Sequence, residues 1–492
     1  MIRAEPTETI SQSARDTIPE SGEQQSVRNP ARADPLPSDL VPVVLQGHVL
    51  DVLRTFPSES VHCAVTSPPY WGLRTYGTEP QVWGGDASCA HSWETATVPS
   101  GNGQVTHPMS GETLNAASAT RSPRVSLSCR NCGAWKGELG LEPAPELYVE
   151  HLADVFDEVG RVLRSDGTLW LNLGDTYCTH PAGLTGAKRW RASTLEVSDR
   201  TGAEQAGAID KRTPGLKEKD LVGIPWRVAF ELRRRGWWLR SDLIWSKRNP
   251  MPEPTRDRPT RSHEYVFLLA KSRRYFYDAE AVREPLRESS LRRLRHHLPN
   301  PMDNPRYRSK HPKGDFRRFP MLANTDPTGR NLRSVWQIAT QPYPGAHFAT
   351  FPEALPEICI RAGTSEKGAC ASCGTPYAHV VRAEGGGIGH DWHPVKSLAM
   401  GRGQGIAAPG IHDGTYRRVD LGFRKVCSCE TRRAVPCLVL DPFMGSGTVL
   451  AVASRLRRRS VGIDLNPVYG VLARERIGSV AVAVAEAGEA AT

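Results

Sequence analysis

The stretch LVLDPFMGSGTVL, residues 438–450, decides the fold. An apolar strand runs directly into a glycine-rich turn, and the turn opens a helix. Gly445 and Gly447 let the backbone approach a ligand closely, and the free N–H groups of a helix start attract a negative group. About 20 residues later the strand SVGID ends at Asp464, whose carboxylate can accept hydrogen bonds from both hydroxyls of a ribose. The pattern predicts an α/β fold that binds a nucleoside cofactor.

Strands and helices alternate along the rest of the chain, which predicts an α/β sheet. Apolar residues between 147 and 162 recur at helical spacing, and we expect Asp166-Gly167 to close that helix. A second helix is expected from Pro225 to Arg235. Further strands are expected at residues 62–66, 168–173, 237–247, 263–272, 437–441 and 460–464.

Length and composition narrow the class of protein. The chain has 492 residues, a net charge of +10 and 39% hydrophobic residues, enough for a large core with insertions. No run of about 18 apolar residues and no apolar signal segment occurs, which favours a soluble protein over a membrane-spanning or secreted one. The odd count of 11 Cys, several in close pairs, indicates reduced thiols or metal ligands and hence a cytoplasmic location.

Shifts in composition suggest the domain boundaries. Residues 1–38 have few large apolar side chains and predict a disordered tail, and residues 481–492 form an Ala-rich tail. Between them we expect three segments, at 39–280, 281–340 and 341–480. Cysteine-bearing insertions are expected at 84–140 and 364–434.

Positive charge is concentrated in one segment. Residues 281–333 contain 13 Lys and Arg against 5 Asp and Glu, which leaves +8 of the whole-chain +10 in 53 residues. Such a segment is either a solvated basic loop or a contact for the phosphates of a nucleic acid, and we expect the second. The candidate contacts are Arg292, Arg293, Arg295, Arg317 and Arg318.

The stretch TSPPYWG, residues 66–72, ends a buried strand in a rigid turn. Two consecutive prolines fix their φ angles and remove two N–H donors. The Ser67 hydroxyl and the Pro68 carbonyl can then accept hydrogen bonds from one amino group, while Tyr70 stacks on a planar ring. This arrangement suits the exocyclic amine of a nucleobase.

The two turns together resemble those of the amino-methyltransferases that modify exocyclic amines of DNA bases with S-adenosylmethionine. The resemblance makes the turn at Ser67 the catalytic turn and the turn at Gly445 the cofactor turn. The catalytic turn comes first in the chain, the basic segment next and the cofactor turn last, and this order resembles the permuted β class of bacterial and phage DNA methyltransferases. The resemblance covers roughly residues 41–83, 141–280 and 341–480. It implies a Rossmann-like methyltransferase sheet with circularly permuted motifs, a basic target-recognition segment and two Cys-bearing insertions. The resemblance thus implies that residues 39–280 are the catalytic half, 281–340 the target-recognition segment and 341–480 the cofactor-binding half.

The resemblance also assigns residues to roles. Those matching the catalytic motif are Ser67, Pro68, Pro69 and Tyr70. Those matching the cofactor site are Asp441, Phe443, Gly445, Gly447 and Asp464, together with His347, Phe348 and Phe351 at the methionine end. Arg240–Asp242 and Trp245–Lys247 lie in strands that resemble those bordering the target-base pocket. One position departs from the family, which often has Gly-Asp before its first helix, with the acid facing the cofactor's adenine. Here the pair is Gly47-His48, so a backbone contact or Asp51 would have to take over that role.

Two sets of cysteines have the spacing of metal ligands. Cys370, Cys373, Cys427 and Cys429 can surround Zn²⁺ tetrahedrally, and Cys89, His91, Cys129 and Cys132 form a similar set. Methyl transfer needs no metal, so we expect one or two structural zinc ions. Pro436-Cys437 could be mistaken for the nucleophile motif of cytosine-C5 methyltransferases, but it begins an apolar strand, which favours a buried side chain.

The sequence therefore predicts a DNA methyltransferase that acts on duplex DNA by flipping the target base. Ser rather than Asp before Pro-Pro favours cytosine N4, with adenine N6 as the alternative. A non-catalytic zinc-ribbon DNA-binding protein and an RNA or small-molecule methyltransferase remain as readings from other classes. The resemblance leaves open whether a restriction endonuclease is a partner.

Overall fold

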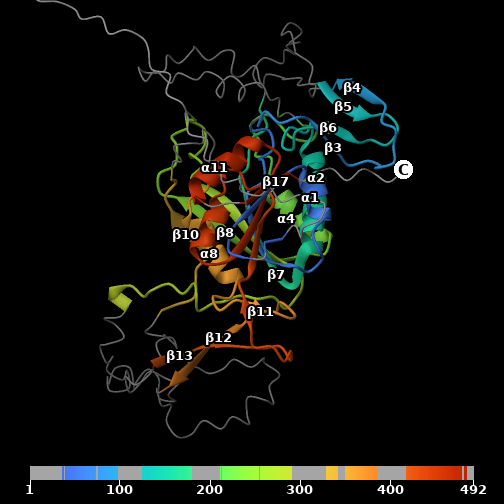
Figure 1. Ribbon diagram of the computed structural model, residues 1–492. Helices are drawn as coiled ribbons and strands as arrows, with labels where there is room; N and C mark the ends of the chain where they lie inside the picture. Colours follow the sequence, from blue (N-terminus) through green and yellow to red (C-terminus); the bar gives the residue numbers. More distant parts are fainter. Residues whose placement is uncertain are drawn as a thin grey trace, which may run out of the picture.

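The computed structural model describes residues 36–37, 39–73, 76–97, 125–179, 211, 213–253, 255–290, 329–341, 350–384, 417–478 and 481–484 (Figure 1). Among these residues no helix combines the length and the apolar character that crossing a bilayer requires.

A nine-stranded sheet forms the centre of the molecule, in the order β10-β8-β9-β7-β2-β15-β16-β1-β17. Its strands are β1 (Val43–Gln46), β2 (Val61–Thr66), β7 (Leu163–Leu173), β8 (Trp238–Lys247), β9 (His263–Ala270), β10 (Val335–Ile338), β15 (Leu438–Asp441), β16 (Arg459–Asp464) and β17 (Ala481–Val484). Only β9 runs against its neighbours, β7 and β8, and the other neighbouring pairs are parallel. This mixed sheet confirms the predicted α/β class.

Within the described ranges, six helices cover the two faces of the sheet. They are α1 (Val49–Arg54), α2 (Pro145–Val162), α4 (Ile224–Arg234), α8 (Ala354–Gly363), α10 (Thr448–Arg455) and α11 (Pro467–Ile477). The first three share one hydrophobic core and the last three share another. Figure 1 shows α1, α2 and α4 on one side of the sheet and α8 and α11 on the other. Successive side chains of β15 point to opposite faces of the sheet. Leu438 and Leu440 therefore belong to the first core and Val439 to the second.

The end of α2 differs from our expectation. The helix stops at Val162 rather than at Asp166-Gly167. Leu163 already has extended backbone angles and pairs with Val61 of β2, so the chain enters the sheet directly from the helix. Pairing with a neighbouring strand, which local spacing does not show, ends the helix one turn early.

The strand directions bring the candidate residues to one edge of the sheet. Parallel strands end at a common edge, so the turns after β1, β2, β15 and β16 meet there. Because β9 is antiparallel, it begins at this same edge, and His263 and Glu264 join the ends of the other strands.

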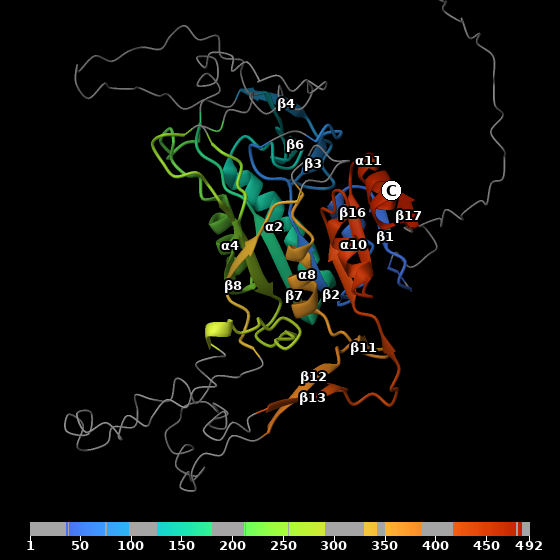
Figure 2. The same ribbon diagram turned by 90° about the vertical axis from the view of Figure 1, so that its left-hand side faces the viewer.

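Each cysteine-bearing insertion carries small sheets of its own. The first completes a four-stranded sheet with the strand that precedes it, in the order β3 (Gln81–Trp83), β6 (Trp135–Gly137), β5 (Val125–Cys129) and β4 (Trp93–Thr97). The second forms two antiparallel pairs, β11 (Ala369–Cys370) with β14 (Ala434–Val435) and β12 (Ala378–Glu384) with β13 (Arg417–Arg424). Figures 1 and 2 place these two insertions beyond opposite ends of the central sheet.

Candidate active site

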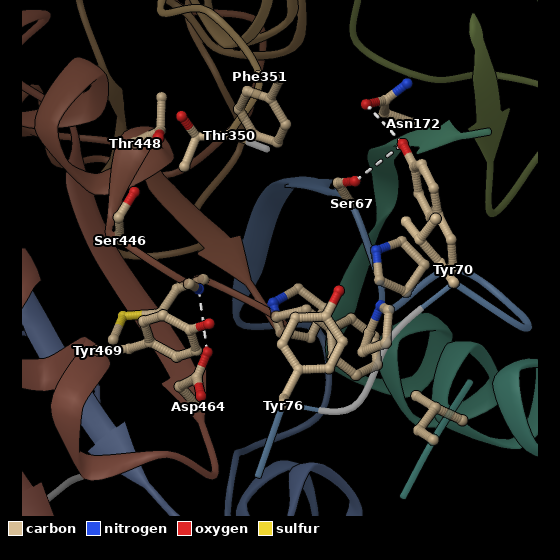
Figure 3. A pocket seen from close by; sticks show the side chains of 18 of the residues that line it. Ser67, Tyr70, Tyr76, Asn172, Thr350, Phe351, Ser446, Thr448, Asp464 and Tyr469 are labelled. Carbon is tan, nitrogen blue, oxygen red and sulfur yellow. Dashed lines mark hydrogen bonds between the residues drawn. The ribbon is translucent and has the colours of Figure 1, made fainter. Parts of the chain in front are cut away.

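A cavity of about 830 Å³ opens at the edge where the parallel strands end. Residues predicted from both halves of the chain line it (Figure 3). From the catalytic turn these are Ser67, Pro68, Pro69 and Tyr70, and from the cofactor side they are Phe351, Phe443, Gly445 and Asp464. Residues almost 400 positions apart in sequence thus share one cavity.

The two glycines of the cofactor turn have different tasks. Gly445 has φ +50°, a conformation that L residues rarely adopt, and a Cβ there would project into open space. Gly447 does not line the cavity, and a Cβ on it would come within 2.8 Å of Ala473 Cβ in α11. Gly445 therefore leaves room for a ligand, whereas Gly447 allows α11 to pack on the start of α10.

Asp464 is held in place by backbone amides. Its Oδ2 accepts a hydrogen bond from Gly445 N at 3.0 Å, drawn in Figure 3, and its Oδ1 accepts one from Asn466 N at 2.9 Å. Burial raises the pKa of Asp464 to about 7. The two amides fix the orientation of this carboxylate in the cavity wall.

Asp441 lies behind the cavity wall. Its buried carboxylate accepts hydrogen bonds from Thr66 Oγ1 at 2.7 Å and from Phe443 N at 3.1 Å. Burial raises the pKa of Asp441 to about 7. The residue joins the end of β2 to the cofactor turn, so its contacts hold the turn rather than a ligand.

The catalytic turn is fixed through Tyr70. The Tyr70 hydroxyl lies 3.2 Å from Ser67 Oγ and 3.2 Å from Asn172 Oδ1, both drawn in Figure 3, and 2.8 Å from Glu264 Oε2. A Cβ on Gly174 would come within 2.6 Å of the Tyr70 ring, so the ring packs directly on that backbone. The Pro69 carbonyl accepts a hydrogen bond from Tyr148 Oη at 2.7 Å.

Asn172 and Glu264 line the cavity and were missed in the sequence analysis. Each stands at an end of a predicted strand, Asn172 in TLWLNL and Glu264 in HEYVF. A search for polar residues at strand ends would have found them, but not their contact with Tyr70.

Trp245 and Lys247, at the end of β8, also line the cavity, whereas Arg240, Ser241 and Asp242 do not. Lys247 Nζ pairs with Glu264 Oε1 at 2.6 Å and lies 5.0 Å from the centre of the Trp245 ring. The half of β8 nearest the site thus brings a cation and an aromatic ring to the cavity.

His48 occupies the position where the family often has an acid. It lines the cavity, and its ring meets the Trp83 ring edge-on with centroids 4.6 Å apart. Burial lowers the pKa of His48. Asp51 does not line the cavity, and its carboxylate faces His48 Nδ1 and Arg54. Trp83 ends β3, directly before the first cysteine-bearing insertion, and β3 pairs with β6 of that insertion, so the sheet shared with the insertion supplies part of the cavity wall.

Both sets of predicted metal ligands are assembled. In each, the four ligand atoms lie within 4.8 Å of one another, as a shared ion requires: Cys89, His91, Cys129 and Cys132, and Cys370, Cys373, Cys427 and Cys429. Hydrogen bonds from Thr375 lower the pKa of the Cys373 thiol to about 6, which favours the thiolate that binds metal. The donor sets fit Zn²⁺.

Cys437 is fully buried outside the cavity, and burial raises the pKa of its thiol to about 11. A thiol in this state is a poor nucleophile, in keeping with the interpretation of Cys437 as a core residue.

Some predicted residues lie outside the described part of the chain. These are His347 and Phe348 at the methionine end, and Arg292, Arg293, Arg295, Arg317 and Arg318 of the basic segment.

Comparison with known proteins identifies the family. Residues 61–371 and 437–475 match the DNA methylase family designated N6_N4_Mtase. Type II methyltransferase M.XycI of Xanthomonas campestris pv. cyanopsidis is 32% identical over 466 residues, 94% of this chain and 94% of the relative. M.Cfr9I of Citrobacter freundii is 32% identical over 92% of both chains, and M.SmaI of Serratia marcescens is 31% identical over 88% of this chain and 90% of the relative.

Among solved structures, the PvuII DNA methyltransferase (cytosine-N4-specific) aligns with a TM-score of 0.42 and 14% identity, over 89% of this chain and 88% of that one. Similarity at that level adds nothing to the sequence relationship. The chain belongs to the N6/N4 DNA methylase family and is an S-adenosylmethionine-dependent DNA amino-methyltransferase.

Proposed function

We propose that the enzyme transfers the methyl group of S-adenosylmethionine to the exocyclic N4 of cytosine in duplex DNA, after the target base has flipped into the cavity. The observation that carries this proposal is the presence of Ser67 and Lys247 in one cavity with the cofactor turn. Family membership sets aside the non-catalytic DNA-binding protein and the RNA or small-molecule methyltransferase.

The cofactor half of the cavity suits a nucleoside with a charged tail. Asp464 accepts hydrogen bonds from the ribose hydroxyls, and Gly445 leaves room for the cofactor beside the turn. Phe351 and Phe443 add apolar walls. When bound there, S-adenosylmethionine supplies an activated methyl group. The chain's own contribution is to hold donor and acceptor in line, which is the chief source of rate in such a transfer.

The other half of the cavity suits cytosine. Ser67 Oγ and the Pro68 carbonyl accept hydrogen bonds from the amine, and Tyr70 packs against the base. Cytosine carries two acceptors beside its amine, N3 and O2, and the Lys247 ammonium supplies donors for such a pair. Adenine carries only N1 on that edge, so Lys247 favours cytosine.

We further propose roles for the remaining parts. The segment 281–340, with Arg292, Arg293, Arg295, Arg317 and Arg318, holds the DNA backbone between the catalytic half (39–280) and the cofactor half (341–480). Zn²⁺ bound at each tetrad stabilises its insertion without entering the reaction. His347 and Phe348 contribute to the methionine end of the cofactor site. The enzyme works in the cytoplasm, where DNA of a bacterial cell lies.

Nucleoside mass spectrometry of DNA treated with the purified enzyme tests the proposal. N4-methylcytosine is the expected product, and a Lys247→Met variant should lose activity while it retains cofactor binding. N6-methyladenine as the product would select the alternative target. The appearance of 5-methylcytosine, lost in Cys437→Ser but kept in Ser67→Ala, would overturn the mechanism.

A further inference from the structure

A chain of polar groups leads from Ser67 away from the cofactor side of the cavity. Ser67 Oγ lies 3.2 Å from Tyr70 Oη, which lies 2.8 Å from Glu264 Oε2. Glu264 Oε1 in turn accepts a hydrogen bond from Lys247 Nζ at 2.6 Å. The four residues come from the catalytic turn, β9 and β8, and all line the cavity.

The Glu264 carboxylate sets the direction of the hydrogen bonds that link it to Tyr70 and Tyr70 to Ser67. A carboxylate can only accept, so the Tyr70 hydroxyl donates to Glu264. Asn172 does not donate to Tyr70 either. Its Nδ2 donates to the Tyr265 carbonyl at 3.0 Å and to Glu264 at 3.1 Å, so the atom that faces the Tyr70 hydroxyl is the acceptor Oδ1. Because the single hydroxyl proton of Tyr70 is already used in this way, the Tyr70 oxygen accepts a hydrogen bond from Ser67 Oγ.

Ser67 Oγ is thereby left as an acceptor. Its proton points to Tyr70, and within the described part of the chain no other group donates to it. A serine hydroxyl can normally donate or accept, and here the donor option is already used. The lone pairs of Ser67 Oγ are therefore available to an N–H group that enters the cavity.

We propose that Glu264 is a positioning residue that fixes Ser67 as the acceptor of the target amine and receives the proton that the amine loses. This inference rests on the proposed role of Ser67 in holding that amine. Lys247 Nζ donates a hydrogen bond to Glu264 Oε1 at 2.6 Å, which fixes the orientation of the carboxylate and leaves Oε2 facing Tyr70.

Methyl transfer forms one bond and breaks another. The nitrogen lone pair forms the N–C bond to the methyl carbon as the C–S bond breaks, and the electron pair of that bond stays on sulfur. The nitrogen then carries one proton too many. That proton passes to Ser67 Oγ, the Ser67 proton passes to Tyr70 Oη, and the Tyr70 proton passes to Glu264 Oε2, which becomes a carboxylic acid.

Two single variants and their combination test the inference. Tyr70→Phe keeps the ring that packs on the base but breaks the chain of hydroxyls. Glu264→Gln keeps the size of the side chain and an acceptor for Tyr70, but it cannot take the proton. Tyr275→Phe is the matched control, because it removes a tyrosine hydroxyl that binds Arg240 outside the cavity.

Single-turnover methyl transfer is the main measurement, with cofactor affinity and the fluorescence of a base analogue at the target position as binding readouts. Tyr70→Phe and Glu264→Gln should each slow transfer by at least ~10-fold with little change in either binding readout. The double variant should be no slower than the slower single variant, because both changes interrupt one chain. Tyr275→Phe should match the wild type.

Wild-type rates in Tyr70→Phe or in Glu264→Gln would overturn the inference, as would multiplicative losses in the double variant. If Glu264→Gln fails to fold, the single-turnover rate of Tyr70→Phe, compared with that of Tyr275→Phe, still tests the inference. The proposed function fails in a different way. An adenine product would change the target base but leave the rate comparison intact, and a fast Ser67→Ala would remove the role of Ser67 itself.

Discussion

The ring of His62 ties the second cysteine cluster to the strand that leads to the catalytic turn. Its Nδ1 accepts a hydrogen bond from Leu438 N at 3.1 Å, so Nε2 carries the proton and donates to the Gly374 carbonyl at 2.9 Å. Burial lowers the pKa of His62 to about 4, which keeps the ring neutral. One residue therefore connects β2, β15 and the loop after Cys373. Arg164 Nη1 adds a bond to the Cys373 carbonyl at 2.8 Å.

Removing metal from this second cluster should loosen the central sheet. Replacing Cys370 and Cys373 with Ser should release about one zinc per chain and lower the free energy of unfolding, because binding at such a site is coupled to folding. Metal analysis together with thermal unfolding measures both effects. Native protein that contains less than about one zinc per chain would contradict the structural metal.

The first cysteine cluster should matter for the cofactor instead. Its sheet carries Trp83, which packs against His48 in the cavity wall. Replacing Cys129 and Cys132 with Ser should weaken cofactor binding about tenfold, or ~1.4 kcal/mol. Isothermal titration calorimetry measures the affinity, and the pair Cys370→Ser and Cys373→Ser is the control. Equal losses of cofactor affinity in both double variants would show that the first insertion has no special link to the cavity.

Cofactor affinity should rise with pH near neutrality. The pKa of Asp464 is about 7 in the folded protein, above the ordinary value of 3.8, so the protonated form persists at pH 6 and is lost as pH rises through 7. The ionised carboxylate accepts more hydrogen bonds from ribose hydroxyls than the acid does. Affinity measured from pH 6 to 8 should therefore increase, whereas Asp464→Asn should bind weakly and lack this component of the pH dependence. An identical pH profile in the variant would exclude Asp464 as its source.

Ser67→Ala should slow methyl transfer while the cofactor still binds. The variant removes one acceptor from the reacting nitrogen, a loss worth about 2–4 kcal/mol of barrier. Tyr70→Ala should be slower still, because it removes both the hydroxyl and the packing face of the ring. Single-turnover rates with parallel cofactor titrations separate the two effects. Loss of cofactor binding in Ser67→Ala would mean that the turn itself had collapsed.

The basic segment should control DNA affinity and its salt dependence. Neutralising Arg292, Arg293 and Arg295 together should weaken DNA binding and reduce the slope of log affinity against log salt by about 2–3, since each phosphate contact releases counterions. Fluorescence anisotropy over a range of salt concentrations measures both, and cofactor binding is the control. Unchanged DNA affinity in the triple variant would remove this segment from the interface.

The sequence by itself determined the local chemistry of this protein. Pro68-Pro69 stiffens its turn wherever the turn lies, Gly445 admits a positive φ, and the paired cysteines are close in the chain before any folding. These properties depend on covalent structure and short-range sterics, so motif and spacing were sufficient to predict the α/β class, the two turns and the two tetrads.

Tertiary structure alone decided which of these residues act together. Glu264 reaches Tyr70 because β9 runs antiparallel and begins at the edge where the parallel strands end. Asp441 accepts a hydrogen bond from Thr66 behind the cavity wall. Trp83 contacts His48 through a sheet that it shares with the first insertion, and no local pattern predicts where that sheet lies. Strand direction and the pairing of distant segments depend on burial across the whole core, and that information is not contained in any short stretch of the chain.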